Sequence, residues 1–170
     1  MLIHRGRLLL YQNTQGSNSL RYALPMVSEI IGVDLGVRSV HVSTQSHCFT
    51  YAADKKLERY QQIQYIYESM YDRFLHDRIY AFVEEPVVAG ARNLRTSLQI
   101  AQISGAVLSV FDGTLVPVST WKKEIVGKGN ATKDDIKEYL KTQPEYEFTK
   151  GKQDWIDATC IRLYGESVSV

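Results

Sequence analysis

The sequence predicts an α/β protein built on a mixed five-stranded sheet that is flanked by helices. Two observations support this fold class. From residue 29 the chain has three short β-prone runs. They are followed by longer segments whose apolar residues recur every three or four positions. The composition, 44% hydrophobic and 23% charged, is ordinary for a globular protein of 170 residues. We therefore expect one domain over residues 28–170, preceded by an extension over residues 1–27.

The N-terminal third of the chain shows only strand and turn patterns. Residues 1–27 contain two β-prone runs around a turn-rich segment, which predicts a β-hairpin-like extension; a poorly ordered arm would fit the same pattern. The domain then begins with runs at Glu29–Asp34, Val40–Thr44 and Cys48–Ala52. Their tight connections predict three strands in an antiparallel meander.

Two long amphipathic helices are predicted in the middle of the chain. The first covers residues 57–74, and its tyrosines, including Tyr60 and Tyr67, are expected in the core. The second covers residues 93–111 and is apolar on two sides. One side can pack on the sheet and the other suggests a subunit interface, although a thick single core would give the same pattern. The suggested interface side consists of Leu94, Leu98, Ala101, Gly105 and Leu108.

The C-terminal part predicts one strand and several helices. Leu115–Val118 has the pattern of a last strand, and Ser119 or Thr120 is expected to cap a brief helix after it. Thr132 is expected to cap a further helix. The final helix is predicted over residues 154–164, before a frayed tail.

A single carboxylate, that of Asp34, ends the apolar run Ile30–Val33 and is followed at once by a turn. Burying an unpaired carboxylate costs several kcal/mol unless a cation or hydrogen-bond donors compensate. Capping of the turn at Leu35–Gly36 is one explanation. A divalent metal site is the other, and it requires carboxylates from elsewhere in the chain.

Two other segments supply such carboxylates. The β-prone run Arg78–Val83 ends in Glu84–Glu85, and because side chains alternate along a strand, only one of these two is expected to share a pocket with Asp34. Asp154 and Asp157 are spaced to share one face of the final helix. Oxygen ligands from several segments are what hard divalent cations require. We expect the acids of the two strands to meet near the same edge of the sheet.

Charge, cysteines and hydropathy narrow the function classes. The formal net charge of +1 excludes a uniformly basic nucleic-acid coat, although local patches can still contact phosphates. Cys48 and Cys160 match no zinc spacing and indicate structural thiols in a reduced protein. The N-terminus lacks the apolar core of a signal peptide, and no run approaches about 18 apolar residues. We expect a soluble cytoplasmic protein with no membrane partner.

Four segments, in matching order and spacing, resemble motifs of the ribonuclease H-like superfamily, and more closely those of the RuvC Holliday-junction resolvases. Gly32–Gly36 resembles the family's Gly-Ile-Asp-Pro-Gly, and Phe82–Glu85 resembles its strand end with a catalytic Glu. Ile125–Lys133 resembles its Val-Val-Gly-x-Gly-x-Ala loop, and Asp154–Asp157 falls on its closing Asp-x-x-Asp. The resemblance covers residues 30–165 and implies a ribonuclease H-like fold.

The resemblance implies a homodimeric, metal-dependent endonuclease that resolves four-way DNA junctions by paired phosphodiester hydrolysis. Its active site would use two Mg²⁺ or Mn²⁺ ions to activate water and stabilise the leaving oxygen. The implied ligands and catalytic residues are Asp34, Glu84, Asp154 and Asp157, with Glu85 outside the site. Cationic residues are expected to contact the DNA backbone. These are Lys122, Lys128 and Lys133, with Arg92 and Arg95 as weaker candidates.

Three departures from the family's pattern bear on substrate and source. Leu35 stands in place of a proline, which alters the stiffness of the turn. Pro86–Val88 stands where many bacterial members have an aromatic residue, which leaves open how a junction is opened and which sequence is cut. The extension over residues 1–27 is unlike the compact bacterial enzymes. A viral or phage relative, acting in the host cytoplasm, would account for it.

Three other functions stay open on the sequence alone. A nuclease of this kind could act more broadly on flaps, Y-forks and other branched DNA. The same fold could bind junctions without cleaving them, although the presence of all four acids argues against this. An enzyme acting on RNA in hybrids is the third, and the closing acid pair and the Gly127–Gly129 loop argue against it by resemblance.

Overall fold

The structure is a computed structural model that describes residues 27–75, 78–87, 93–150 and 152–169. The predicted N-terminal hairpin therefore lies outside the described residues, and so does Arg92. The strands are β1 (Glu29–Leu35), β2 (Ser39–Ser43), β3 (Cys48–Ala52), β4 (Ile79–Glu84) and β5 (Asp112–Val116). The helices are α1 (Arg59–Phe74), α2 (Leu94–Val110), α3 (Val118–Val126), α4 (Lys133–Leu140), α5 (Tyr146–Thr149) and α6 (Gln153–Val168).

The strands form one mixed sheet in the order β3-β2-β1-β4-β5. The pairs β1–β2 and β2–β3 are antiparallel, whereas β4 is parallel to both β1 and β5. This confirms the predicted α/β class, the mixed five-stranded sheet and the antiparallel meander. Because Val33 of β1 lies opposite Val83 of β4 in a parallel pair, the carboxyl ends of these two strands meet at one edge of the sheet.

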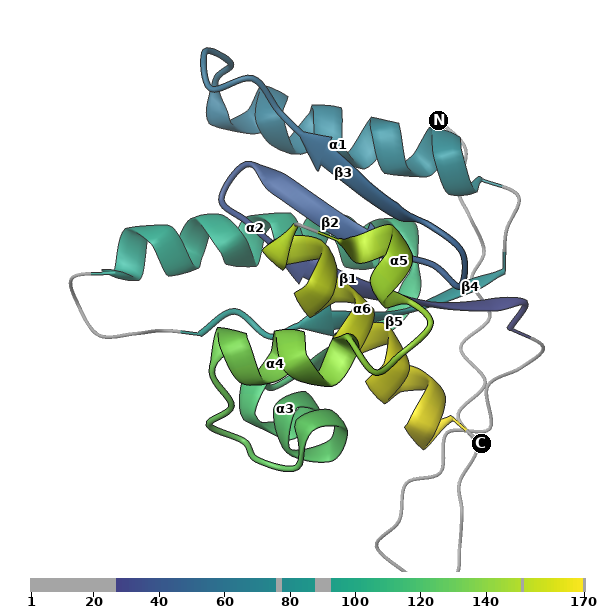
Figure 1. Ribbon diagram of the computed structural model, residues 1–170. Coiled ribbons are helices and arrows are strands. Elements are labelled where there is room, and N and C mark those ends of the chain that lie inside the picture. Colours follow the sequence, from purple (N-terminus) through teal and green to yellow (C-terminus); the bar gives the residue numbers. More distant parts are fainter. Residues whose placement is uncertain (1–26, 76–77, 88–92, 151, 170) are drawn as a thin grey trace, which may run out of the picture.

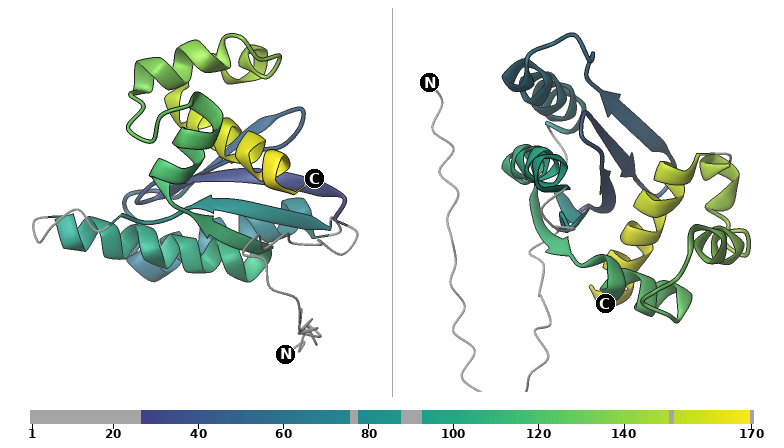
Figure 2. Two further views of the ribbon diagram at one scale, coloured as in Figure 1. Left: turned by 90° about the horizontal axis from the view of Figure 1, so that it is seen from below. Right: turned by 90° about the vertical axis from the view of Figure 1, so that its left-hand side faces the viewer.

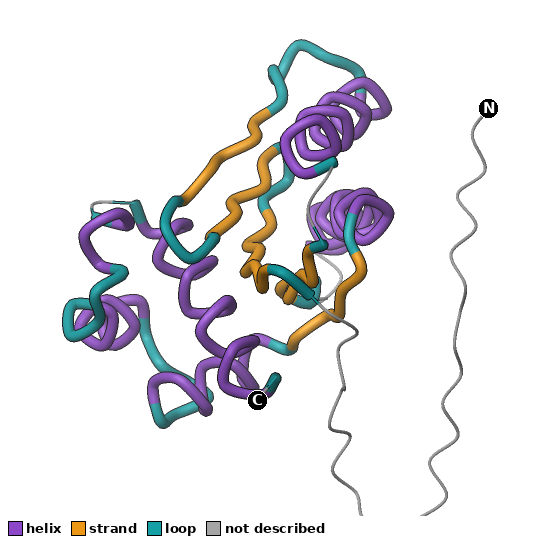
Figure 3. Tube along the Cα trace, turned by 90° about the vertical axis from the view of Figure 1, so that its right-hand side faces the viewer, coloured by secondary structure: helices purple, strands orange, loops and turns teal. Residues whose placement is uncertain are grey.

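Helices cover both faces of the sheet (Figures 1 and 2). On one face, α1 and α2 enclose an apolar core with residues of β1 such as Ile31 and Val33. On the other face, α6 crosses the sheet, and α3 and α4 pack beside it around a second core that includes Phe82 and Ile161. Figure 3 shows these three layers, with helices on either side of the strands.

Strand β1 determines how closely α6 approaches the sheet. Gly32 faces α6, and a Cβ at this position would overlap the carbonyl oxygen of Ala158 and the backbone nitrogen of Arg162. Glycine is therefore required for this close approach. The contact brings the first turn of α6 over the carboxyl ends of β1 and β4.

The last strand begins earlier than the sequence predicts. β5 covers Asp112–Val116 rather than 115–118, because its first residues pair with β4 and Pro117, which has no N–H to donate, ends it. Pro117 is also the N-cap residue of α3, so that Ser119 and Thr120 lie inside this helix and do not cap it. The short helix α5 is a further element that the sequence pattern did not indicate.

Helix α6 continues to Val168, so the prediction of a frayed tail after Gly165 is wrong. Gly165 suggested a helix end, but its role is packing. A Cβ on Gly165 would overlap the aromatic ring of Phe82. The glycine therefore lets this part of α6 lie against β4, and the packing of Gly165 on Phe82 favours continuation of the helix beyond the glycine.

Helix α1 is confirmed, with a correction to its buried face. Its buried apolar side chains are Ile66, Met70 and Phe74, whereas Tyr60 is 67% exposed. The buried face of α1 is therefore rotated by about one residue relative to the face that carries the predicted tyrosines. Tyr67 is partly buried and stacks on Tyr71.

Helix α2 is confirmed within a residue at each end, and its two apolar sides have different surroundings. Ile103 and Val107 are fully buried against the sheet. Leu94 and Leu98 are 46% and 56% exposed, and a Cβ on Gly105 would meet nothing within 4 Å. Among the described helices, none combines the length and the hydropathy of a membrane span.

Candidate functional site

Four polar side chains form a row across the sheet on the face that α6 covers. Thr50 of β3 lies opposite His41 of β2, and His41 lies opposite Asp34 of β1. Directly opposed residues of antiparallel strands project from the same face. Glu84, the last residue of β4, follows in the parallel register beside Asp34. The sheet therefore contributes a threonine, a histidine and two acids to one line of side chains.

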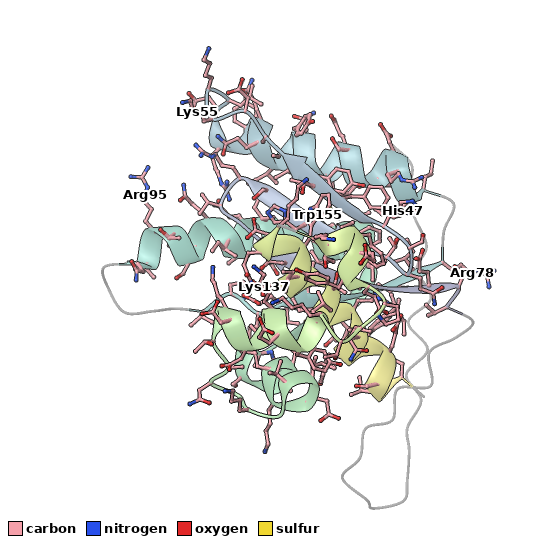
Figure 4. All side chains as sticks on the ribbon, viewed as in Figure 1. His47, Lys55, Arg78, Arg95, Lys137 and Trp155 are labelled. Carbon is pink, nitrogen blue, oxygen red and sulfur yellow. The ribbon has the colours of Figure 1, made fainter. Side chains whose placement is uncertain are left out.

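The first turn of α6 lies over this row. The indole Nε1–H of Trp155 donates to Thr50 Oγ1 at 2.8 Å. Asp154 Oδ2 lies 3.5 Å from His41 Nε2. Figure 4 labels Trp155 at this end of α6, over the strands. The helix therefore brings its own acids to the acids of the two strands.

One cavity of about 390 Å³ is lined by all four acids that the sequence singled out. They are Asp34, Glu84, Asp154 and Asp157. Ligand atoms of Asp34, His41 and Asp154 lie within 4.8 Å of one another. Several carboxylates with one imidazole are a donor set that divalent cations such as Mg²⁺ or Mn²⁺ accept. The residues present therefore fit a divalent metal centre.

Burial and mutual repulsion perturb the acids of this cavity. The pKa of Asp34 is raised to about 8, first by burial and then by the charges of Glu84, Asp157 and Asp154. Burial, followed by the charge of Asp157, raises the pKa of Glu84. Burial likewise raises the pKa of Asp157. A cation would offset the repulsion, so its uptake near neutral pH should release a proton from Asp34.

Residues of α3 and α4 add donors and positive charge beside Glu84. The indole N–H of Trp121, which is 1% exposed, has no well-aligned hydrogen bond to any described residue, yet it lies near enough to lower the pKa of Glu84 against the effect of burial. Lys122 donates from Nζ to a carbonyl oxygen of the α3–α4 loop at 2.9 Å, and its charge lowers the pKa of Glu84 and Asp157. The charge of Lys133 likewise lowers the pKa of Asp157.

Two other predicted DNA contacts, Lys128 and Arg95, are not among the residues that line the cavity. Lys128 forms an ion pair with Asp135 at 2.8 Å, and this hydrogen bond helps to lower the pKa of Asp135 to about 2. Arg95 is exposed in the first turn of α2 and extends away from the body of the molecule (Figure 4). Arg92 lies outside the described residues. The roles of these three residues in DNA binding stay predictions.

Sequence reasoning missed His41, which is 8% exposed. Burial lowers the pKa of His41, and the charge of Asp154 opposes that effect. A usable signal was the hairpin spacing. Gly36 N–H donates to Ser39 O at 2.9 Å across a two-residue turn, and counting outward from this bond pairs Asp34 with His41. Trp121, Thr50 and Trp155 carried no comparable signal.

The fold is similar to that of two solved RuvC structures. One is RuvC of Thermus thermophilus, with a TM-score of 0.65 and 14% sequence identity over 80% of this chain and 92% of that chain. The other is T. thermophilus RuvC in complex with a Holliday junction substrate, with a TM-score of 0.63, 14% identity, and coverage of 80% and 91%. Neither a protein-family model nor a curated protein sequence matches the chain. The likeness confirms the predicted RuvC-like, ribonuclease H-like fold.

Proposed function

We propose that this protein is a metal-dependent endonuclease that resolves four-way DNA junctions by paired phosphodiester hydrolysis. The observation that carries the proposal is the convergence of four carboxylates from three separate segments on one cavity. Such a cluster destabilises the cation-free fold, as the raised pKa of Asp34 indicates. Acids that repel one another can stay grouped when they bind cations, because the positive charge offsets the repulsion.

The ligands of the proposed centre are Asp34, Glu84, Asp154 and Asp157, which would hold two Mg²⁺ or Mn²⁺ ions. When bound, the ions would supply an activated water and a counter-charge for the leaving oxygen of the phosphodiester. The strands hold two of the acids on a rigid backbone, while α6 orients the other two from above. This division keeps the ligand positions independent of flexible loops.

Lys122 and Lys133 are proposed to contact the scissile phosphate. Both line the cavity, and both act electrostatically on Asp157. A phosphate that reaches the acid cluster must therefore come close to two ammonium groups. The indole of Trp121, buried beside Glu84, opposes the effect of burial on the pKa of this carboxyl and so favours the ionised form that a ligand needs.

A four-way junction is the proposed substrate because T. thermophilus RuvC, whose fold is similar over 80% of this chain, is known in complex with a Holliday junction substrate. Paired cleavage of opposed strands requires two active sites. The exposed side of α2, with Leu94, Leu98, Ala101 and Gly105, is the proposed homodimer interface. Its apolar and small side chains would allow two copies of this helix to pack closely.

Cleavage assays on matched substrates test the proposal. The purified protein is incubated with a mobile four-way junction and with linear duplexes of the same arm sequences, each with Mg²⁺ and with EDTA. We expect two opposed nicks in the junction with Mg²⁺ only. Equal cleavage of flaps and Y-forks would favour a broader branched-DNA nuclease. Cleavage of an RNA–DNA hybrid in preference to the junction would contradict the proposed substrate class.

An Asp34→Asn variant separates catalysis from binding. We expect it to lose cleavage and to keep junction binding, because the side chain keeps its shape but loses a charged metal ligand. Asp112→Asn is the matched control. Asp112 is an exposed acid opposite Tyr80, at the end of the sheet away from Glu84, and its replacement should leave cleavage unchanged. Wild-type cleavage by Asp34→Asn would contradict the proposed centre, and binding without cleavage by the wild type would favour a non-catalytic junction-binding protein.

A further inference from the structure

His41 lies among the proposed metal ligands, although no motif of the sequence indicates it. We infer that His41 Nε2 is a fifth protein ligand of the metal centre, a nitrogen donor beside Asp34 and Asp154. This inference rests on the proposed function and adds to it the class of cation that the site prefers.

The geometry brings the imidazole to the acids from the sheet itself. His41 is the direct cross-strand partner of Asp34, so both side chains project toward α6. Its Nε2 lies 3.5 Å from Asp154 Oδ2, and one ligand atom from each of these three residues falls within a 4.8 Å span. A cation bound between the two aspartates would therefore lie within reach of this nitrogen.

A hydrogen-bonded chain fixes the orientation of the imidazole ring. His41 Nδ1 lies 3.1 Å from Thr50 Oγ1, and the same hydroxyl accepts from Trp155 Nε1–H at 2.8 Å. A hydroxyl oxygen can accept twice, so His41 Nδ1–H can donate to it and leave a lone pair on Nε2. Metal-ligating histidines usually donate their other N–H in this way. Thr50 and Trp155 are therefore placed to fix the orientation of His41 as a metal ligand.

Within the described part of the chain, Nε2 itself has one neutral contact that a cation could replace. Ser39 Oγ lies 3.1 Å from Nε2, and this hydroxyl is free to rotate. Nε2 also lies near the Asp154 carboxylate, whose side chain is 60% exposed. The imidazole side chain is only 11% exposed, so it is held in place at the wall of the cavity.

A nitrogen ligand changes which cation the centre prefers. Mg²⁺ and Ca²⁺ favour oxygen ligands, whereas Mn²⁺ and later transition ions accept imidazole more readily. With His41 coordinated, the protein should bind Mn²⁺ in preference to Mg²⁺. Replacement of His41 by alanine should remove this preference and weaken Mn²⁺ binding by about tenfold, with a smaller effect on Mg²⁺.

Pulsed electron paramagnetic resonance of Mn²⁺ bound to the full chain, without DNA, tests the inference directly. We expect a ¹⁴N coupling from a coordinated imidazole in the wild type, and its replacement by a ¹⁵N coupling after labelling with [¹⁵N]histidine. The coupling should be lost in His41→Ala. It should persist in His47→Ala, the matched control, because His47 is exposed and lies on the turn that joins β2 to β3 (Figure 4).

The outcomes distinguish the inference from the proposed function. Wild-type protein that binds Mn²⁺ without a histidine-dependent nitrogen coupling would overturn the role of His41 and leave the carboxylate centre standing. Wild-type protein that binds no Mn²⁺ would overturn both. The labelling experiment needs no substitution, so the absence of a histidine coupling overturns the inference even if His41→Ala does not fold. Because the label enters all four histidines, the more conservative His41→Gln then assigns a coupling that is present, which this variant should lose.

Discussion

The two faces of the sheet, built by the same strands, differ in character at the carboxyl ends of β1 and β4. The face toward α1 and α2 is closed and apolar, and Ile31, Val33 and Ala81 are fully buried there. The face toward α6 ends in a cavity lined by acids, in which the carboxyl group of Asp34 is pushed toward its protonated form. The first face stabilises the fold, whereas the second reduces stability at the position where it can bind a cation.

Adjacent residues show the same contrast. Val33 and Asp34 are neighbours in β1, yet one belongs to the apolar core and the other to the acid cluster. Strand alternation alone produces this division. A site of this kind needs a rigid, well-packed opposite face, because the strands must hold like charges together. Four predictions test or refine this contrast.

The largest effect is expected at the end of β4. Glu84→Gln should reduce junction cleavage on the order of 10³-fold, because it removes a charged ligand of the proposed metal centre. This factor corresponds to a loss of about 4 kcal/mol of transition-state stabilisation. Glu85→Gln is the matched control, since Glu85 is exposed and does not line the cavity. It should cleave at the wild-type rate. Single-turnover cleavage in Mg²⁺ measures both, and equal losses in the two variants would contradict the assignment of opposite faces.

The second effect is a pH dependence of stability in the metal-free protein. The pKa of Asp34 is raised from 3.8 to about 8, so the folded state binds this proton more tightly than the unfolded state does. The contribution of the protonated Asp34 carboxyl to the stability of the fold is therefore complete below pH 3.8 and is lost as the pH rises through about 8. Thermal unfolding in EDTA should show a melting temperature that falls over this interval by several degrees.

The control for this pH dependence is Asp34→Asn, which removes the titrating group. Its melting temperature in EDTA should fall less with rising pH than that of the wild type and should exceed it at pH 8. Mg²⁺ should raise the wild-type melting temperature at that pH more than that of the variant. A steeper fall in the variant would contradict the direction of the Asp34 pKa shift.

The third effect tests the apolar face. Val33→Ala should lower the free energy of unfolding by roughly 2 kcal/mol, because it leaves a cavity in a fully buried position. The folded fraction should retain cleavage activity within a few fold. Urea unfolding and active-site-normalised rates measure the two quantities. A loss of activity as large as that of Glu84→Gln would show that the two faces are not separable.

The smallest effect on the single chain is expected on α2. Leu98→Lys should change the free energy of unfolding by less than about 0.5 kcal/mol, because Leu98 is 56% exposed. It should nevertheless shift the solution mass from dimer to monomer and uncouple the two nicks of a junction. Val168→Lys, at the exposed end of α6, is the control. A dimer that persists in Leu98→Lys, measured by light scattering, would contradict the proposed interface.

Much of the fold could be predicted from local patterns. The spacing of apolar residues indicated the helices α1 and α2, and the runs before Asp34 and Glu84 indicated two strands that end in acids. Predictions failed where a tertiary contact overrode the local signal. Gly165 suggested a helix end, but the helix continues because Phe82 packs against it. Pro117 similarly ends β5 and begins α3 in one step.

By itself, the sequence determined which residues can carry charge and which strand or helix each of them belongs to, because alternation and helical spacing are properties of neighbours along the chain. Only the tertiary structure decided that Asp154 of α6 lies beside His41 and that Trp121 lies against Glu84. These relations depend on strand register and on the close crossing of α6 over Gly32. Both are set by packing between segments that are distant in the chain.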